Sequence, residues 1–263
     1  MMEWLSYAGA GTIAGLVAGL FGVGGGLVIV PILLMVFSWQ HMSPDVAIHV
    51  AIGTSLMTIT ITSLSSISAH HRYGNTDWAT VKLLAPGLIL GSLAGAVIAS
   101  SLSSAWLQNV FAVFALLMAI RLWLPKPTVI SDRLMGRKAL SSYGVGAGVV
   151  SAMVGIGGGS LVVPYLVMAG QQVQRAVGTA AACGFPIAFS GVIGFMLMGT
   201  QVHHISAPWQ TGFVHWQAFA GIIVTSVFMA PLGAKLAQHL PSRHLSQLFS
   251  LLLFTIGLVF LAR

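Results

Sequence analysis

The sequence predicts an all-α polytopic membrane protein made of two homologous repeats, and three observations lead to this fold class. Of the 263 residues, 57% are apolar and only 6% are charged, whereas soluble domains have about 45–50% and about 25%. Eight long apolar segments follow one another along the chain, and its two halves share a glycine-rich pattern. This composition excludes a soluble enzyme, a nucleic-acid-binding domain and a secreted disulfide scaffold.

The apolar segments form two groups of four on either side of a polar loop. The first group covers residues 7–37, 46–69, 79–100 and 106–124, and the second covers 142–169, 176–198, 213–237 and 245–261. Each has about the length that a spanning helix needs. We therefore divide the chain into a first transmembrane repeat (1–124), a basic cytoplasmic loop (125–138) and a second transmembrane repeat (139–263).

Duplication is indicated when one half is slid over the other. An offset of 133 residues superimposes six glycines and one proline, namely 11, 15, 22, 24, 25, 26 and Pro31 on 144, 148, 155, 157, 158, 159 and Pro164. An offset of 125 places Ala51, Gly53 and Thr54 on Ala176, Gly178 and Thr179, and an offset of 138 places Gly95 on Gly233. The halves therefore read as homologous repeats separated by small insertions or deletions.

The shared glycines have two different roles. Gly11 and Gly15, like Gly144 and Gly148, are four residues apart, a spacing that lets another helix approach closely in lipid. The glycines at 22–26 and 155–159 instead follow one another almost directly, and each costs about 1 kcal/mol relative to alanine within a helix. We expect the helix to break there and a second, short helix to begin, with Pro31 and Pro164 near its first turn.

Paired broken helices favour a transport site, because lipid cannot satisfy the freed backbone groups. A half-helix that begins near the midplane directs unpaired N–H groups and a partial positive charge inward, which suits an anion. The four acidic residues are Glu3, Asp45, Asp77 and Asp132, and all fall in predicted ends or loops. No carboxylate is therefore predicted within a span for a metal, an alkali cation or a proton relay.

These motifs resemble a known family. The run from Ala14 to Pro31, its second copy ending at Pro164, and the Ala-x-Gly-Thr element at 51–54 and 176–179 are similar to the sulfite exporter TauE/SafE family, also called the toluene-sulfonate uptake permeases. The resemblance covers essentially the whole chain. It implies a secondary transporter or exporter of a small sulfur-containing anion, such as sulfite, sulfoacetate or another organosulfonate, and leaves substrate and direction open.

The candidate substrate-binding residues lie at the breaks and on the helices that follow them. They are Gly24, Gly25, Gly26, Gly157, Gly158, Gly159, Thr54, Ser55 and Thr179. The hydroxyls could donate to sulfonate oxygens, or they could bond within and between helices, and the sequence leaves both interpretations open. The second copy reads Gly178-Thr179-Ala180 and lacks one hydroxyl, so we expect an asymmetric site.

Three further residues have competing interpretations. Cys183 is favoured as a small apolar packing group, and His49 as a hydrogen-bonded helix residue rather than one that titrates near substrate. Arg175 is favoured as a flanking cytoplasmic charge over an attractor of anions. No catalytic residue, metal site or cofactor is predicted. The histidine doublets have no carboxylate or cysteine that would complete a set of metal ligands. The alternative function is an intramembrane enzyme or a membrane assembly factor. An enzyme would need a nucleophile beside a base, and the sequence shows no such pair within the spans.

The expected partners are a small anionic substrate and the lipid bilayer, and no nucleic acid. A coupling ion and a homo-oligomer stay open.

If each broken segment crosses the membrane once, eight basic residues lie inside and three outside, whereas re-entrant hairpins place ten inside and one outside. The positive-inside rule therefore predicts inverted repeats with six crossings, two re-entrant hairpins and both termini outside. The loop 200–211 should face outside, in a multi-pass protein of the bacterial-type inner membrane.

Overall fold

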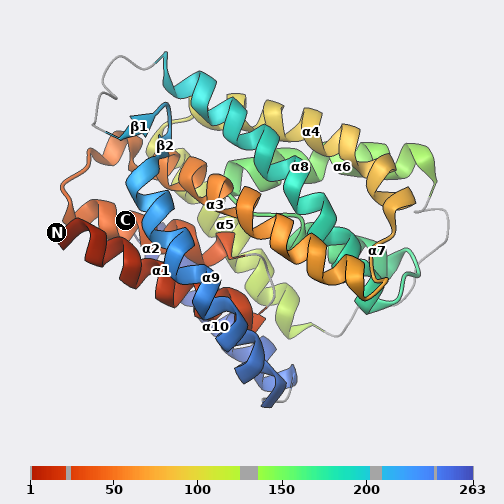
Figure 1. Ribbon diagram of the computed structural model, residues 1–263. Coiled ribbons are helices and arrows are strands. Elements are labelled where there is room, and N and C mark those ends of the chain that lie inside the picture. Colours follow the sequence, from red (N-terminus) through yellow and green to blue (C-terminus); the bar gives the residue numbers. More distant parts are fainter. Residues whose placement is uncertain (1, 22–24, 125–135, 202–208, 240–241, 263) are drawn as a thin grey trace.

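The computed structural model describes residues 2–21, 25–124, 136–201, 209–239 and 242–262, and this part of the chain is almost entirely helical (Figure 1). The helices are α1 (Met2–Phe21), α2 (Gly26–Trp39), α3 (Pro44–Arg72), α4 (Trp78–Ser101), α5 (Ser104–Trp123), α6 (Arg137–Val154), α7 (Gly159–Met168), α8 (Val173–Gly199), α9 (Trp216–His239) and α10 (Ser242–Leu261). A short antiparallel pair, β1 (Gln210–Thr211) and β2 (Val214–His215), precedes α9 and was not predicted from the sequence.

Four helices among the described residues, α3, α4, α5 and α8, are long and apolar enough to cross a membrane. Large apolar side chains also cover outward faces of the bundle, with Leu90, Leu117 and Phe228 more than half exposed. Lipid is the solvent in which such a surface is stable. These findings agree with the predicted all-α membrane protein, whereas the repeat and the number of crossings stay predictions.

Both glycine clusters coincide with helix ends. Helix α1 ends at Phe21 and α2 begins at Gly26, and α6 ends at Val154 and α7 begins at Gly159. Gly25 and Gly155 have φ values of 77° and 75°, in the left-handed region where a Cβ would cause strain. The breaks are therefore built into backbone conformations that glycine adopts most easily.

The two prolines lie deeper in their helices than the sequence suggests. Pro31 is inside α2 and Pro164 is inside α7, each five residues after the first residue of the helix rather than in its first turn. A proline there has no N–H for the carbonyl four residues earlier, which is that of Leu27 or Ser160. The first turn of each short helix is therefore tied to the rest of its helix by fewer hydrogen bonds.

Each broken segment folds back on itself as a helical hairpin. The Tyr7 hydroxyl near the start of α1 donates to Oε1 of Gln40 just after α2, at 2.7 Å. In the second hairpin the ring of Tyr143 stacks on Tyr165 with centroids 3.7 Å apart. The start of the first arm thus lies beside the later part of the second arm in both hairpins. The first arms have 20 and 18 residues, and each begins five residues before the apolar segments predicted to start at residues 7 and 142.

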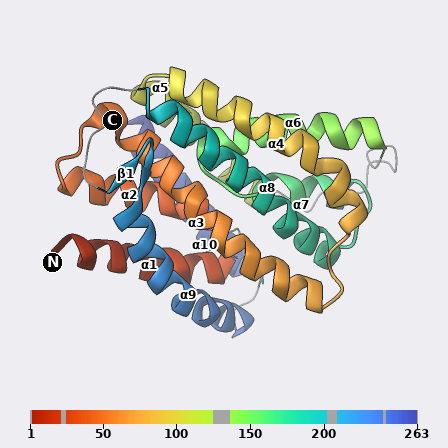
Figure 2. The same cartoon turned by 45° about the horizontal axis from the view of Figure 1, so that its top comes forward.

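The first helix of each half packs on the fourth helix of the other half, α1 on α9 and α6 on α4 (Figures 1 and 2). The glycines spaced by four make this approach possible. A Cβ added to Gly15 would lie 2.6 Å from the Ser226 Cα, and one added to Gly148 would lie 2.5 Å from the Leu88 oxygen. Leu88 and Ser226 are the residues that the offset of 138 pairs, so the two contacts are equivalent.

The bundle has two distinct ends. The start of α1, the end of α10 and the β1–β2 hairpin lie at one end, here called the terminal end (Figures 1 and 2). The α3–α4 and α7–α8 connections meet at the opposite end, where Asp77 bonds to Gln171. We call this the basic end, because it holds most of the described Lys and Arg residues, namely Arg72, Lys82, Arg121, Arg137, Lys138, Arg175 and Lys235.

Candidate functional site

The two glycine breaks touch each other inside the bundle. A Cβ added to Gly26, the first residue of α2, would collide with the carbonyl oxygen of Gly155 and lie 2.9 Å from the Ile156 Cα. Gly26 and Ile156 belong to different hairpins and are more than a hundred residues apart in sequence. The folding of the two halves therefore brings together the backbones that the sequence singles out. Gly24 lies outside the described residues.

Helices α3 and α8 flank this meeting point. The Ser55 hydroxyl of α3 is fully buried and donates to the Gly155 oxygen at 2.9 Å. On the other side, a Cβ at Gly158 would lie 2.8 Å from the Ala180 oxygen and 3.3 Å from the Cys183 Cβ. Cys183 is therefore a buried packing neighbour of the second break. Gly157 has more room, since an added Cβ would meet only the Ile59 Cγ2 at 3.3 Å.

Two helix N-termini begin at these breaks. Gly25 precedes α2 and Gly158 precedes α7, and neither position has a side-chain capping hydrogen bond. The first N–H groups of a helix have no partner within the helix, and the aligned peptide dipoles place a partial positive charge there. An anion is the ligand that such a pair of N-termini favours.

Thr54 and Thr179 bind protein backbone. Thr54 Oγ1 accepts the N–H of His215 and Thr179 Oγ1 accepts the N–H of Asp77, each at 3.0 Å. Asp77 and His215 directly precede α4 and α9, and the offset of 138 pairs them. Each threonine thus anchors the start of the fourth helix of the opposite half, which supports the structural interpretation that the sequence left open.

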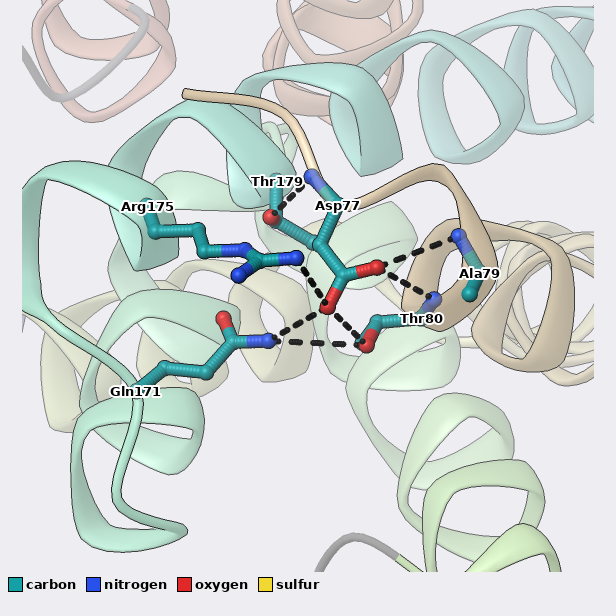
Figure 3. Close-up of polar contacts among 6 residues, drawn as sticks. All are labelled: Asp77, Ala79, Thr80, Gln171, Arg175 and Thr179. Carbon is teal, nitrogen blue, oxygen red and sulfur yellow. Dashed lines mark hydrogen bonds and ion pairs between the residues drawn. The ribbon is translucent and has the colours of Figure 1, made fainter. Parts of the chain in front are cut away.

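Asp77 is the centre of a polar cluster at the basic end (Figure 3). Its Oδ1 accepts the N–H groups of Ala79 and Thr80 at 3.2 and 3.3 Å, so it caps α4. Its Oδ2 accepts the Thr80 hydroxyl at 2.9 Å and Gln171 Nε2 at 3.0 Å. Arg175 lies 3.6 Å from the same oxygen and is 57% exposed. The cluster ties the start of α4 to the α7–α8 connection and gives Arg175 a protein partner.

His215 occupies the corresponding place at the terminal end. Its Nδ1 accepts the N–H of Ala218 at 3.2 Å and so caps α9. Its ring centroid lies 5.6 Å from that of Tyr7 and 5.7 Å from that of Phe37. The equivalent caps thus differ in chemistry, one in a charged cluster and one among aromatic rings. Sequence reasoning missed both residues, although the 138-residue offset pairs them.

His49 is held by the backbone of another helix. Its Nε2 lies 3.1 Å from the Ala99 oxygen and 3.2 Å from the Leu102 oxygen, at the end of α4. Its ring stacks on Phe213 with centroids 5.1 Å apart. These contacts make His49 a structural link at the terminal end. Within the described ranges, no group of three His, Cys, Asp or Glu side chains could hold a metal ion, and the doublet His203–His204 lies outside them.

Comparison with known proteins identifies the family. The family model described as sulfite exporter TauE/SafE matches residues 7–260. A "probable membrane transporter protein" of Haemophilus influenzae is 32% identical over 94% of this chain and 94% of its own length. Proteins of the same description from Methanocaldococcus jannaschii and Bacillus subtilis are 29% and 28% identical, over 95% and 94% of this chain and 92% and 93% of theirs. No solved structure matches the chain. The chain belongs to the sulfite exporter TauE/SafE family of membrane transporters.

Proposed function

We propose that this protein is a secondary transporter of a small sulfur-containing anion, such as sulfite, sulfoacetate or another organosulfonate. The anion binds where the two glycine breaks meet, between the N-termini of α2 and α7. One observation carries the proposal: Gly26, the first residue of α2, lies directly against Gly155, four residues before α7 begins, so the two glycine breaks meet inside the bundle. Family membership supports the substrate class.

The charges of the chain favour an anion over a cation. Of the described acidic residues, Glu3 and Asp45 each follow the first residue of a helix and Asp77 caps one. In the described part of the chain, therefore, the middle of the bundle has no carboxylate to hold a metal ion or to relay protons. A site of backbone N–H groups and hydroxyls can bind a sulfonate without titrating near neutral pH.

The proposal includes an inverted arrangement of the halves, with two re-entrant hairpins and six crossings. The exchanged contacts fit a two-fold relation between the halves, because Gly15 meets Ser226 as Gly148 meets Leu88. Helix α5 ends and α6 begins at the basic end, opposite the two chain termini (Figure 1), and this supports three crossings per half rather than four. We assign the basic end to the cytoplasm of a bacterial-type inner membrane, as the positive-inside rule favours.

Counterflow in proteoliposomes tests the transport function. Purified protein should exchange labelled sulfite against internal sulfite or sulfoacetate, and Gly157→Ala should reduce this exchange by about tenfold or more, because the methyl group blocks approach of the anion to the backbone. Gly157→Ala should still fold, since only the Ile59 Cγ2 lies near the added carbon, at 3.3 Å.

Gly146→Ala on α6 is the matched control, because nothing lies within 4 Å of its added Cβ. It should exchange sulfite like the wild type. Wild-type rates in Gly157→Ala would refute the assignment of the break as the site. A sulfite pool that is chemically converted rather than exchanged would favour the alternative of an intramembrane enzyme.

A further inference from the structure

A serine at the second glycine break has a buried hydroxyl without a hydrogen-bond partner among the described residues. Ser160 is the second residue of α7 and is 8% exposed, yet its Oγ has no hydrogen-bond partner in the described part of the chain. Buried polar side chains are nearly always hydrogen-bonded, since an unpaired one loses its hydration without compensation. A buried hydroxyl without a protein partner can donate to an oxygen of a bound ligand.

The position of Ser160 directs its hydroxyl towards the break. In an α-helix each Cα–Cβ bond tilts towards the N-terminus of the helix, so a side chain in the first turn leans back over the N-terminal end. Ser160 follows Gly159 directly, and α7 is 10 residues long with Gly158 as its uncapped N-cap. The hydroxyl and the free N–H groups of α7 therefore converge on the same side of the second break.

Three serines lie near the second break in sequence or by contact, and the offsets pair each of them with an apolar residue. Ser55 bonds to Gly155, and Ser151, one turn before Gly155, is fully buried with an unpartnered Oγ. The offsets pair Ser55, Ser151 and Ser160 with Ala180, Ala18 and Leu27. Leu27 is itself buried, at 2% exposure. Directly after its last glycine, the second break thus presents the Ser160 hydroxyl where the first break presents the apolar Leu27.

We propose that the transported oxyanion binds on the second break rather than midway between the two, with the Ser160 hydroxyl donating a hydrogen bond to one of its oxygens. The first-turn N–H groups of α7 donate to the same anion. The apolar side formed around Leu27 accommodates the organic part of a sulfonate or leaves a gap beside sulfite. This inference rests on the proposed transport function and assigns its specificity to one serine.

Binding measurements on the purified full-length protein test the proposal, with sodium sulfite and sodium sulfoacetate as probes in isothermal titration. Ser160→Ala should weaken binding by about tenfold or more, as expected for the loss of a hydrogen bond to a charged group. The same variant should unfold at an unchanged or higher temperature, because it removes an unpaired buried hydroxyl. Ser160→Thr, which keeps the hydroxyl, should restore most of the affinity.

Ser151→Ala is the matched control. It also removes an unpartnered buried hydroxyl, but its Cβ tilts along α6 away from the break, so its affinity should stay within about twofold of the wild type. If Ser160→Ala binds both anions like the wild type, or if Ser151→Ala loses as much affinity, the assignment to Ser160 is overturned while the transport function stands. If the wild type binds neither anion, the proposed function itself fails.

Discussion

Replacing Thr54 by valine tests whether its hydroxyl has a structural role or a substrate-binding role. Its hydroxyl accepts the His215 N–H at 3.0 Å in a buried position, and valine has nearly the same shape without the acceptor. Thr54→Val therefore removes the side-chain acceptor of a backbone N–H where His215 is only 7% exposed. An unpaired buried donor costs about 1–3 kcal/mol. Because water has little access, we expect a loss of about 2–3 kcal/mol of unfolding free energy, at the upper part of that range.

Two matched variants give stability losses with which that of Thr54→Val can be compared. Thr179→Val removes the equivalent acceptor at the basic end, where the Asp77 side chain is 15% exposed and water can replace it, so about 1 kcal/mol should be lost. Thr58→Val removes a hydroxyl that only donates to the Thr54 carbonyl within α3, and it should cost about 0.5 kcal/mol. The order of the three losses follows directly from their hydrogen-bond partners.

Thermal unfolding in detergent measures the effect, with the fluorescence of the seven tryptophans as the signal. In chains of this size, each kcal/mol corresponds to about 2–4 °C, so Thr54→Val should unfold about 5–10 °C below the wild type. Its dissociation constant for sulfite should stay within about twofold. A Thr54→Val variant with wild-type stability and a sulfite affinity reduced by about 1–2 kcal/mol would refute the structural role and restore substrate binding.

Two further predictions concern helix packing and topology. Gly15→Ala should cost about 1–3 kcal/mol of stability by forcing α1 away from Ser226, whereas Gly9→Ala, with nothing within 4 Å, should raise stability by up to about 1 kcal/mol in the same unfolding assay. Topology can be tested in intact cells with a thiol reagent that cannot cross the membrane, after the buried cysteine has been replaced by alanine. The reagent should label a Ser43→Cys protein, whose new thiol is at the terminal end, and should not label a Tyr73→Cys protein, whose new thiol is at the basic end. The reverse pattern would invert the proposed orientation.

The sequence predicts the positions of the helices and breaks well, because long apolar runs and clustered glycines act locally. Gly25 and Gly155 break helices through their own backbone conformations, which needs no tertiary information. The roles of the hydroxyls depend instead on which helices meet. Thr54 resembles a site residue until the fold places the His215 N–H beside it, and Ser160 attracts no notice until burial leaves it without a partner.

The caps of the fourth helices were missed for a similar reason. Asp77 and His215 have unlike side chains, so a search for identical residues at paired positions passes over them. Their equivalence rests on geometry, since each donates its own N–H to a threonine of the opposite half. Repeats related by an exchange of contacts can preserve a backbone interaction while the side chain at that position changes freely.

The exchanged packing of the first helices has a consequence for biogenesis. Gly11 and Gly15 of α1 contact α9, a helix near the end of the chain. During synthesis this face of α1 has no permanent partner until residue 226 has left the ribosome, so the first hairpin waits beside the translocon or in lipid for most of translation. Residues 1–124 made alone should be degraded, and the same fragment should survive when it is produced together with residues 125–263. The first half is thus not expected to be a unit of folding on its own.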